Sequence, residues 1–140
     1  MKIVAIDYGT KRVGLAATDD LQMIALPLQT VASAELMLFL KNYVAQEQVS
    51  KFVVGLPLQT SGEFSQSYSG VRAFVVQLQK VFQHIPIEMH DERYTSKMAS
   101  AAIAQSSLSK QKRRSKALID GVAAVILLQS YLEQQNYLKG

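Results

Sequence analysis

The chain has 140 residues, of which 49% are hydrophobic and none is cysteine, and its formal net charge is +4. This composition predicts one globular domain spanning residues 1–140 and excludes a disordered chain, a disulfide-stabilised domain and a thiolate zinc site. No apolar run approaches the roughly 20 residues that cross a bilayer, and a strand follows Lys2 directly where a signal peptide would begin, so we expect a cytoplasmic protein without membrane contact.

The first predicted element is a strand at residues 3–6, an uninterrupted apolar run that suits burial on both faces. It ends at Asp7, and a turn leads to a second apolar run at residues 13–17, the predicted antiparallel partner. An acid at the end of a buried strand is costly unless its charge is compensated. We therefore expect Lys11 and Arg12 in the turn to hold an anionic ligand, the alternative being that Asp7 only caps backbone N–H groups.

The rest of the chain alternates between strand and helix patterns. Residues 22–30 predict a third strand interrupted by Pro27, and Ser33 is the expected N-cap of the next helix. The later predicted elements are a helix carrying Leu36, Phe39, Leu40, Tyr43 and Val44, a strand at 52–54, a helix carrying Val71, Phe74, Val75, Leu78 and Phe82, a strand at 87–91, a helix from Thr95 or Ser96 through Ile103, and a helix at 116–134. This order predicts an α/β fold: a mixed five-stranded sheet, made of an antiparallel three-strand meander and two strand–helix units, with helices on its faces.

A basic segment precedes the last helix. Lys110, Lys112, Arg113, Arg114 and Lys116 place five positive charges within seven residues, and without them the net charge would be slightly negative. Because the excess is local, it predicts contact with a polyanion. The alternative is a solvated loop, and we expect this polar stretch to be mobile without nucleic acid.

Acidic residues stand where three predicted elements are expected to meet. Asp7 ends the first strand, Asp91 and Glu92 end the last strand, and Asp120 shares a helix face with small and apolar residues. Converging carboxylates repel unless cations lie between them, and oxygen ligands favour Mg²⁺ or Mn²⁺. Two such ions can activate water and stabilise the leaving oxygen in phosphodiester cleavage. The pattern therefore predicts a metal-dependent nuclease whose basic segment binds phosphates.

Two assignments within this acidic set stay open. Asp120 alternatively forms an i,i+4 ion pair with Lys116 on the helix surface. Strict alternation groups Asp91 with the apolar residues of its strand and Glu92 with the polar ones, which by itself favours Asp91 as the inward-facing acid. Alternation often breaks at a strand end, so both residues remain candidates.

Aromatic and histidine side chains near these acids have no predicted chemical role. His84 is expected on the surface, and the sequence assigns no role to His90. Tyr8, Tyr68 and Tyr94 are at least as compatible with core or edge packing as with stacking on bases.

Four motifs carry a resemblance to a known family. They are I-D-Y-G-T-K-R-V-G-L-A at 6–16, V-V-G-L-P-L at 53–58, H-D-E-R-Y-T-S at 90–96 and K-A-L-I-D-G-V-A-A-V-I-L-L-Q-S-Y at 116–131. Nearly end to end, the chain resembles the YqgF/RuvX family, which has an RNase H-like fold related to the RuvC Holliday-junction resolvase. The resemblance implies a nuclease in 5′-end maturation of pre-16S rRNA, and an older reading of the family implies a Holliday-junction resolvase.

The resemblance also implies site residues. Carried over, the family's acids fall on Asp7, Glu92 and Asp120, expected as catalytic residues and metal ligands, with Asp91 as a substitute. Related RNase H-like folds often place an acid after the meander, but here the strand at 52–54 continues into Gly-Leu-Pro. We expect Mg²⁺ or Mn²⁺, two ions with substrate bound, and pre-16S rRNA as substrate rather than branched DNA, with ribosomal particles as further partners. The expected nucleic-acid-binding residues are Lys11, Arg12, Arg93, Lys110, Lys112, Arg113, Arg114 and Lys116.

Two other functions compete with the nuclease. An Asp-x-Gly-Thr turn after a strand also occurs in actin-like phosphotransferases, but those need two such domains around a cleft. A non-catalytic RNA-binding, ribosome-associated factor needs only the basic segment. The acidic residues argue against a non-catalytic RNA-binding factor, because carboxylates beside a phosphate would repel it and would not strengthen binding.

Overall fold

A computed structural model describes residues 1–9, 11–56, 68–91 and 116–139 of the chain. The strands are β1 (Lys2–Asp7), β2 (Arg12–Thr18), β3 (Ala25–Ala32), β4 (Val49–Leu56) and β5 (Ile87–Asp91). The helices are the short 3₁₀ helix η1 (Ser33–Glu35), α1 (Leu36–Gln46), α2 (Tyr68–Val81) and α5 (Lys116–Lys139). The helix expected from Thr95 or Ser96 and the polar stretch 106–115 lie outside the described residues. Within the described ranges, no helix combines the length and apolarity needed to cross a bilayer.

The strands form one mixed sheet in the order β3-β2-β1-β4-β5. β1, β2 and β3 pair antiparallel, whereas β1 pairs parallel with β4 and β4 pairs parallel with β5. The predicted α/β fold, a meander feeding two strand–helix units, is confirmed. Because β1, β4 and β5 run in the same direction, their carboxyl ends lie at one edge of the sheet, where ligands bind in folds of this kind.

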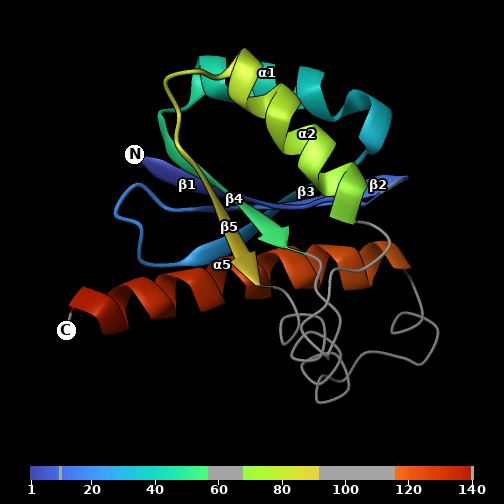
Figure 1. Cartoon of the computed structure of the whole chain (residues 1–140). Helices are drawn as coiled ribbons and strands as arrows, with labels where there is room; N and C mark the ends of the chain where they lie inside the picture. Colours follow the sequence, from blue (N-terminus) through green and yellow to red (C-terminus); the bar gives the residue numbers. More distant parts are fainter. Residues whose placement is uncertain (10, 57–67, 92–115, 140) are drawn as a thin grey trace.

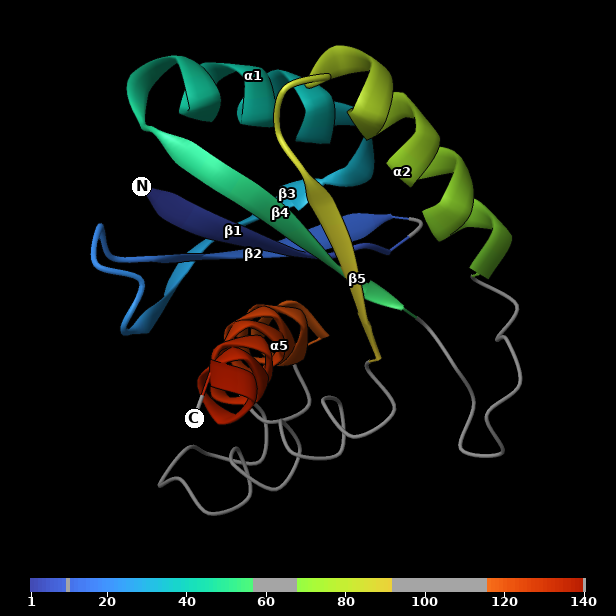
Figure 2. The same cartoon turned by 60° about the vertical axis from the view of Figure 1, so that its left-hand side comes forward.

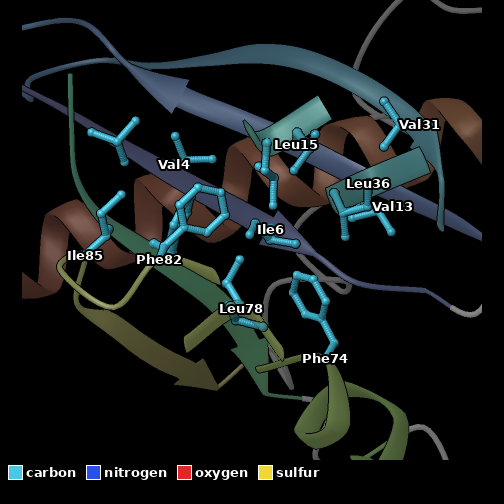
Figure 3. Packing of buried hydrophobic residues seen from close by; sticks show 14 of the residues in the cluster. Val4, Ile6, Val13, Leu15, Val31, Leu36, Phe74, Leu78, Phe82 and Ile85 are labelled. Carbon is cyan, nitrogen blue, oxygen red and sulfur yellow. The ribbon is translucent and has the colours of Figure 1, made fainter. Parts of the chain in front are cut away.

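Helices cover both faces of the sheet. The helices α1 and α2 lie on one face, and α5 crosses the other face over β1, β2 and β3 (Figures 1 and 2). Figure 3 shows the core under α1 and α2, where Val4, Ile6 and Leu15 of the sheet meet Phe74 and Leu78 of α2. A second core lies under α5. The central position of β1 between two covered faces explains its uninterrupted apolar run.

Two local expectations are corrected. Ser33 is not the N-cap of α1: it opens η1 instead, and α1 begins at Leu36 without a capping side-chain bond from Glu35. The Ser33 N–H donates to the Lys11 carbonyl at 2.9 Å, which extends the β2–β3 pairing and keeps Ser33 outside the helix. Pro27 does not interrupt β3, because an edge strand tolerates a missing donor, and the pairing with β2 shifts register beside it.

Candidate functional site

Asp7 lies at the carboxyl end of β1, on the face of the sheet that α5 covers. Val4 and Ile6 belong to the core under α1 and α2, whereas Ile3 and Ala5 belong to the core under α5. Asp7 continues the series of Ile3 and Ala5, since successive strand residues point to opposite faces. The residue is half-buried and has interactions of its own, so it is not an isolated surface acid.

The helix α5 brings position 120 toward the same end of the sheet. Ala124, Leu127 and Tyr131 are buried against the sheet, and position 120 precedes them by four, seven and eleven residues, on the same helical stripe. Figure 1 shows the first turns of α5, in orange, at the end of the sheet where β1 finishes, while the N-terminus and the C-terminus lie at the opposite end.

A contact at the far end supports this alignment. Ile3 and Tyr131 line the same small cavity. From there β1 runs four residues to Asp7, about 13 Å, and α5 runs back eleven residues to position 120, about 16 Å. The backbone therefore carries position 120 of α5 to the end of the sheet where Asp7 lies (Figure 1). The Asp120 side chain itself is outside the described part of the structure, as is a Lys116–Asp120 pair.

Asp91, at the end of β5, lies on a different face of the sheet from Asp7. Asp91 pairs with Leu56 of β4, and Ile87 of the same strand packs against the core under α1 and α2. By alternation Asp91 shares the face of Ile87. The sequence pattern thus groups Asp91 correctly with the apolar residues of its strand. However, both faces of the sheet are covered, and the face that Asp91 shares with Ile87 is the one opposite Asp7. The grouping therefore turns Asp91 away from Asp7 rather than toward it. Glu92 lies outside the described residues.

A polar cluster links β4 and β5 to α5, and no pattern in the sequence predicts it. We define the tyrosine cluster as Lys51, Glu88 and Tyr131. The Tyr131 hydroxyl accepts a hydrogen bond from Lys51 Nζ at 2.8 Å and donates one to a Glu88 carboxylate oxygen, while Lys51 Nζ lies 3.4 Å from the other Glu88 oxygen. Burial and the bond to Glu88 raise the pKa of Tyr131, and the bond to Tyr131 raises the pKa of Lys51. At neutral pH the phenol is therefore protonated and the ammonium charged.

The two histidines have different surroundings. His90 Nε2 lies 2.9 Å from the Ser130 hydroxyl of α5, and its ring meets the Tyr131 ring edge-on. Burial lowers the pKa of His90, and the nearby Asp91 charge partly offsets this. His84 is exposed, as expected, and lines a cavity with Met1 at the end of the sheet away from Asp7.

The turn after Asp7 is tightly built. A Cβ on Gly9 would lie 2.4 Å from the Arg12 carbonyl oxygen, so the close approach of the two chain segments requires glycine there. Lys11 is exposed and Arg12 is half-buried at the start of β2. These are the expected phosphate-binding cations that the structure describes beside Asp7. Arg93, Lys110, Lys112, Arg113 and Arg114 lie outside the described residues, and Lys116 is described only as the first residue of α5.

Divalent-metal ligation is compatible with the donors at this end of the sheet. Among the side chains that the structure describes, no group of three or more Asp, Glu or His residues forms a metal site. Of the expected ligands Asp7, Glu92 and Asp120, Asp7 is the one whose side chain falls in that part, and the substitute Asp91 also falls there. Carboxylate oxygens are the donors that Mg²⁺ and Mn²⁺ prefer, so the chemistry of the donor set fits such an ion.

The family and its relatives cover almost the whole chain. The family model for RuvX, described as Holliday junction resolvase, matches residues 1–134. A protein of Porphyromonas gingivalis is 50% identical over 135 residues, 96% of this chain and 98% of its own length. A protein of Parabacteroides distasonis is 47% identical over 136 residues, 97% of each chain. Both carry the name "Putative pre-16S rRNA nuclease".

Solved structures of resolvases share the fold. The Thermus thermophilus RuvC in complex with a Holliday junction substrate aligns over 97% of this chain and 96% of its own, with a TM-score of 0.57 and 13% identity. The fowlpox virus resolvase in complex with junction DNA aligns over 96% and 99%, with a TM-score of 0.60 and 12% identity. At these identities the similarity establishes the RNase H-like fold, and the fold alone.

Proposed function

The chain belongs to the RuvX family, and from that premise we propose that it is a divalent-metal-dependent endonuclease that cleaves pre-16S rRNA during 5′-end maturation. The proposal treats residues 1–140 as one RNase H-like domain. The observation that carries it is the position of Asp7, at the carboxyl end of the central strand on the face where α5 arrives with position 120. In a metal-dependent nuclease, carboxylates at such an edge hold the cations that activate water and stabilise the leaving oxygen.

Asp7, Glu92 and Asp120 are the residues that we propose as metal ligands. Glu92 follows Glu88 and His90 in steps of two, and both of those side chains bond to α5, which supports Glu92 rather than Asp91 as the second carboxylate. When bound, Mg²⁺ or Mn²⁺, as a pair with substrate present, lowers the pKa of water and stabilises the leaving oxygen. The three carboxylates would hold these cations, and the alternation along β5, which groups Asp91 with Ile87, argues against Asp91 as a substitute ligand.

The cations near the turn position the substrate. Lys11 and Arg12 flank the tight turn that follows Asp7, so a phosphate bound there lies next to the proposed ligands. We propose that Arg93 and the basic segment, from Lys110 to Lys116, extend this contact along the nucleic acid. Phosphate contacts of this kind fix the register of the substrate and carry no sequence preference.

The relatives' names favour RNA as the substrate. Relatives at 47–50% identity over nearly full length are named for pre-16S rRNA, whereas the resolvases bound to DNA junctions share only 12–13% identity. We therefore place the protein in the cytoplasm, on ribosomal precursor particles. The family description, Holliday junction resolvase, is the reason to keep four-way DNA as the second candidate substrate.

The test compares both substrates in one assay. Purified protein with Mn²⁺ or Mg²⁺ is incubated with 5′ fragments of pre-16S rRNA and with four-way DNA junctions, and Asp7→Asn and a chelator serve as controls. We expect metal-dependent cleavage of the RNA that Asp7→Asn abolishes. Preferential cleavage of the junction would assign the chain to resolvases, and salt-dependent binding of RNA without cleavage would make it a binding factor.

A further inference from the structure

The contacts between α5 and the sheet are of two kinds. Under most of its length α5 packs through small and apolar side chains such as Ala124, Leu127 and Leu128. Such packing determines which face of the helix is buried, but because it is not directional it fixes small rotations of the helix and slides along its axis less sharply than hydrogen bonds do. Among the described residues, the directional bonds from α5 to the sheet come from Tyr131 and Ser130, and both reach the β4–β5 half.

The tyrosine cluster holds its members in one arrangement. Tyr131 is 2% exposed, and its hydroxyl uses its proton toward Glu88 and a lone pair toward Lys51. The ammonium of Lys51 also lies 5.3 Å from the centre of the Tyr131 ring. Because the phenol donates in one direction and accepts from another, a rotation or a slide of α5 breaks at least one of these bonds.

The cluster is in register with position 120. Tyr131 lies eleven residues after that position, about three helical turns, and so on the same stripe of α5. Glu88 lies in β5, whose last residue, Asp91, directly precedes Glu92 in the sequence. The hydrogen bond between Tyr131 and Glu88 thus joins the helix that carries position 120 to the strand that ends just before Glu92.

From this geometry we infer that Tyr131 is a positioning residue which, with Glu88 and Lys51, sets the rotation and axial position of α5 and thereby the approach of Asp120 to Asp7 and Glu92. The inference rests on the proposed function, since it concerns how that site is assembled. Tyr131 is buried and lies about 16 Å along the helix from position 120, so we assign it no contact with substrate. Its effect is expected on metal loading rather than on nucleic-acid binding.

The test removes the hydroxyl and keeps the ring. Tyr131→Phe is expected to raise the Mn²⁺ concentration for half-maximal cleavage about three- to tenfold, below the roughly 10–100-fold loss seen when a bond to a ligand itself is removed. The KM for RNA stays near the wild-type value. Glu88→Gln keeps an acceptor for the phenol but loses the charge that attracts Lys51, so it gives a smaller change in the same direction and replaces Tyr131→Phe if that variant fails to fold.

The opposite layer of the molecule supplies matched controls. Tyr43 of α1 is partly buried near Lys2, which pairs with Glu47 at 3.5 Å. Tyr43→Phe and Glu47→Gln make the same chemical changes away from α5, and both are expected to leave the metal dependence unchanged. A melting temperature measured for all four variants separates a general loss of stability from a change in the site.

A distance measurement decides the inference without relying on cleavage. The chain has no cysteine, so spin labels can be placed through Arg72→Cys on α2 and Gln129→Cys on α5, both exposed positions. Tyr131→Phe is expected to shift or broaden the interlabel distance distribution, and Tyr43→Phe is not. Wild-type metal dependence and an unchanged distribution in Tyr131→Phe would overturn the inference. Absence of cleavage by the wild type would refute the proposed function, and the distance distribution would still decide whether Tyr131 holds α5 in place.

Discussion

The ring of Tyr8 stacks on the ring of Phe74, with centroids 4.7 Å apart and an interplanar angle of 14°. Tyr8 is the residue after Asp7, and Phe74 is a buried residue of α2 on the opposite side of the sheet from α5. The stack therefore ties the turn that follows Asp7 to the far helix layer. It favours packing over base stacking for Tyr8, because Phe74 already occupies one face of the ring.

Removing the Tyr8 ring should weaken both stability and the site. We expect Tyr8→Ala to lower the free energy of unfolding by about 1–3 kcal/mol, less than the truncation of a fully buried aromatic residue. Cleavage should fall as well, since the turn that holds Asp7 loses its anchor. Tyr8→Phe retains the stack and should match the wild type in denaturant melts and in cleavage; a large loss in Tyr8→Phe would instead indicate a contact of the hydroxyl with substrate.

Asp7→Asn should abolish cleavage without unfolding the protein. The amide keeps the shape of the carboxylate but removes the charge that a divalent cation requires, while the loss of repulsion among the acids offsets the lost interactions of Asp7. We expect the free energy of unfolding without metal to stay within about 1 kcal/mol of the wild type. RNA binding should largely survive, because the cations are untouched.

The measurements for Asp7→Asn are a thermal melt, a binding isotherm and a cleavage assay on one preparation with Mn²⁺. Cleavage at the wild-type rate would show that Asp7 is structural. Unfolding of the variant would show that Asp7 serves the hairpin turn, and the same three measurements on Asp120→Asn would then decide the metal site.

Glu92→Gln and Asp91→Asn should differ sharply in activity. Asp91 lies on the face of β5 opposite that of Asp7, so Asp91→Asn should keep cleavage within a few-fold of the wild type. Glu92→Gln should abolish cleavage if Glu92 holds the metal. The comparison is made at saturating Mn²⁺ and repeated at low Mn²⁺; the reverse ranking would place the second carboxylate at Asp91.

Asp19 should make the β2–β3 loop sensitive to acid. Its carboxylate accepts hydrogen bonds from the N–H groups of Ile24, Met23 and Leu21, and these bonds lower the pKa of Asp19. A lowered folded-state pKa stabilises the fold above the unfolded value of about 3.9, and that contribution is lost as pH falls through the folded pKa. Asp19→Ala should therefore lower the melting temperature at pH 7, but much less once the pH lies below the lowered folded-state pKa of Asp19. The exposed neighbour gives the control Asp20→Ala, and a pH-independent difference for Asp19→Ala would contradict the prediction.

Much of the fold follows from local pattern. Three patterns predict elements that are buried on the sheet: the apolar run before Asp7, the helical spacing from Leu36 to Val44 and the apolar stripe through Leu78. Each of these elements forms where its pattern predicts. The sequence pattern places Ser33 at the N-cap of α1, but the position of the cap depends on where the backbone leaves β3. The hydrogen bond from the Ser33 N–H to the Lys11 carbonyl fixes that point. Pro27 stays within a strand only because β3 is an edge, a property of the sheet order.

Less of the candidate site is visible in the sequence. Alternation along β5 groups Asp91 with Ile87, but only the structure shows that Ile87 faces the layer of α1 and α2 rather than α5. The bonds of the tyrosine cluster join residues 37, 43 and 80 positions apart, and no local spacing predicts such contacts. An acidic position such as Asp7 can be proposed from the sequence because an acid at the end of a buried strand costs free energy unless its charge is compensated. Tyr131 and Glu88 are residue types that helices and strands commonly contain, so they attract no such attention.

The basic segment should account for much of the salt dependence of RNA binding. Replacing Lys112, Arg113 and Arg114 together with Ala removes up to three phosphate contacts, and each contact on single-stranded RNA contributes a slope of about −0.7 in log K against log salt. We expect weaker binding at all sequences and a flatter slope, measured by anisotropy titrations from low to moderate salt with a chelator present. A second triple variant replaces Lys41, Arg72 and Lys80, exposed cations of α1 and α2 on the face of the sheet away from α5 (Figure 1), and removes the same charge. An equal loss in both variants would mean that net charge alone attracts RNA, and an unchanged slope in the first would make the basic segment a solvated loop.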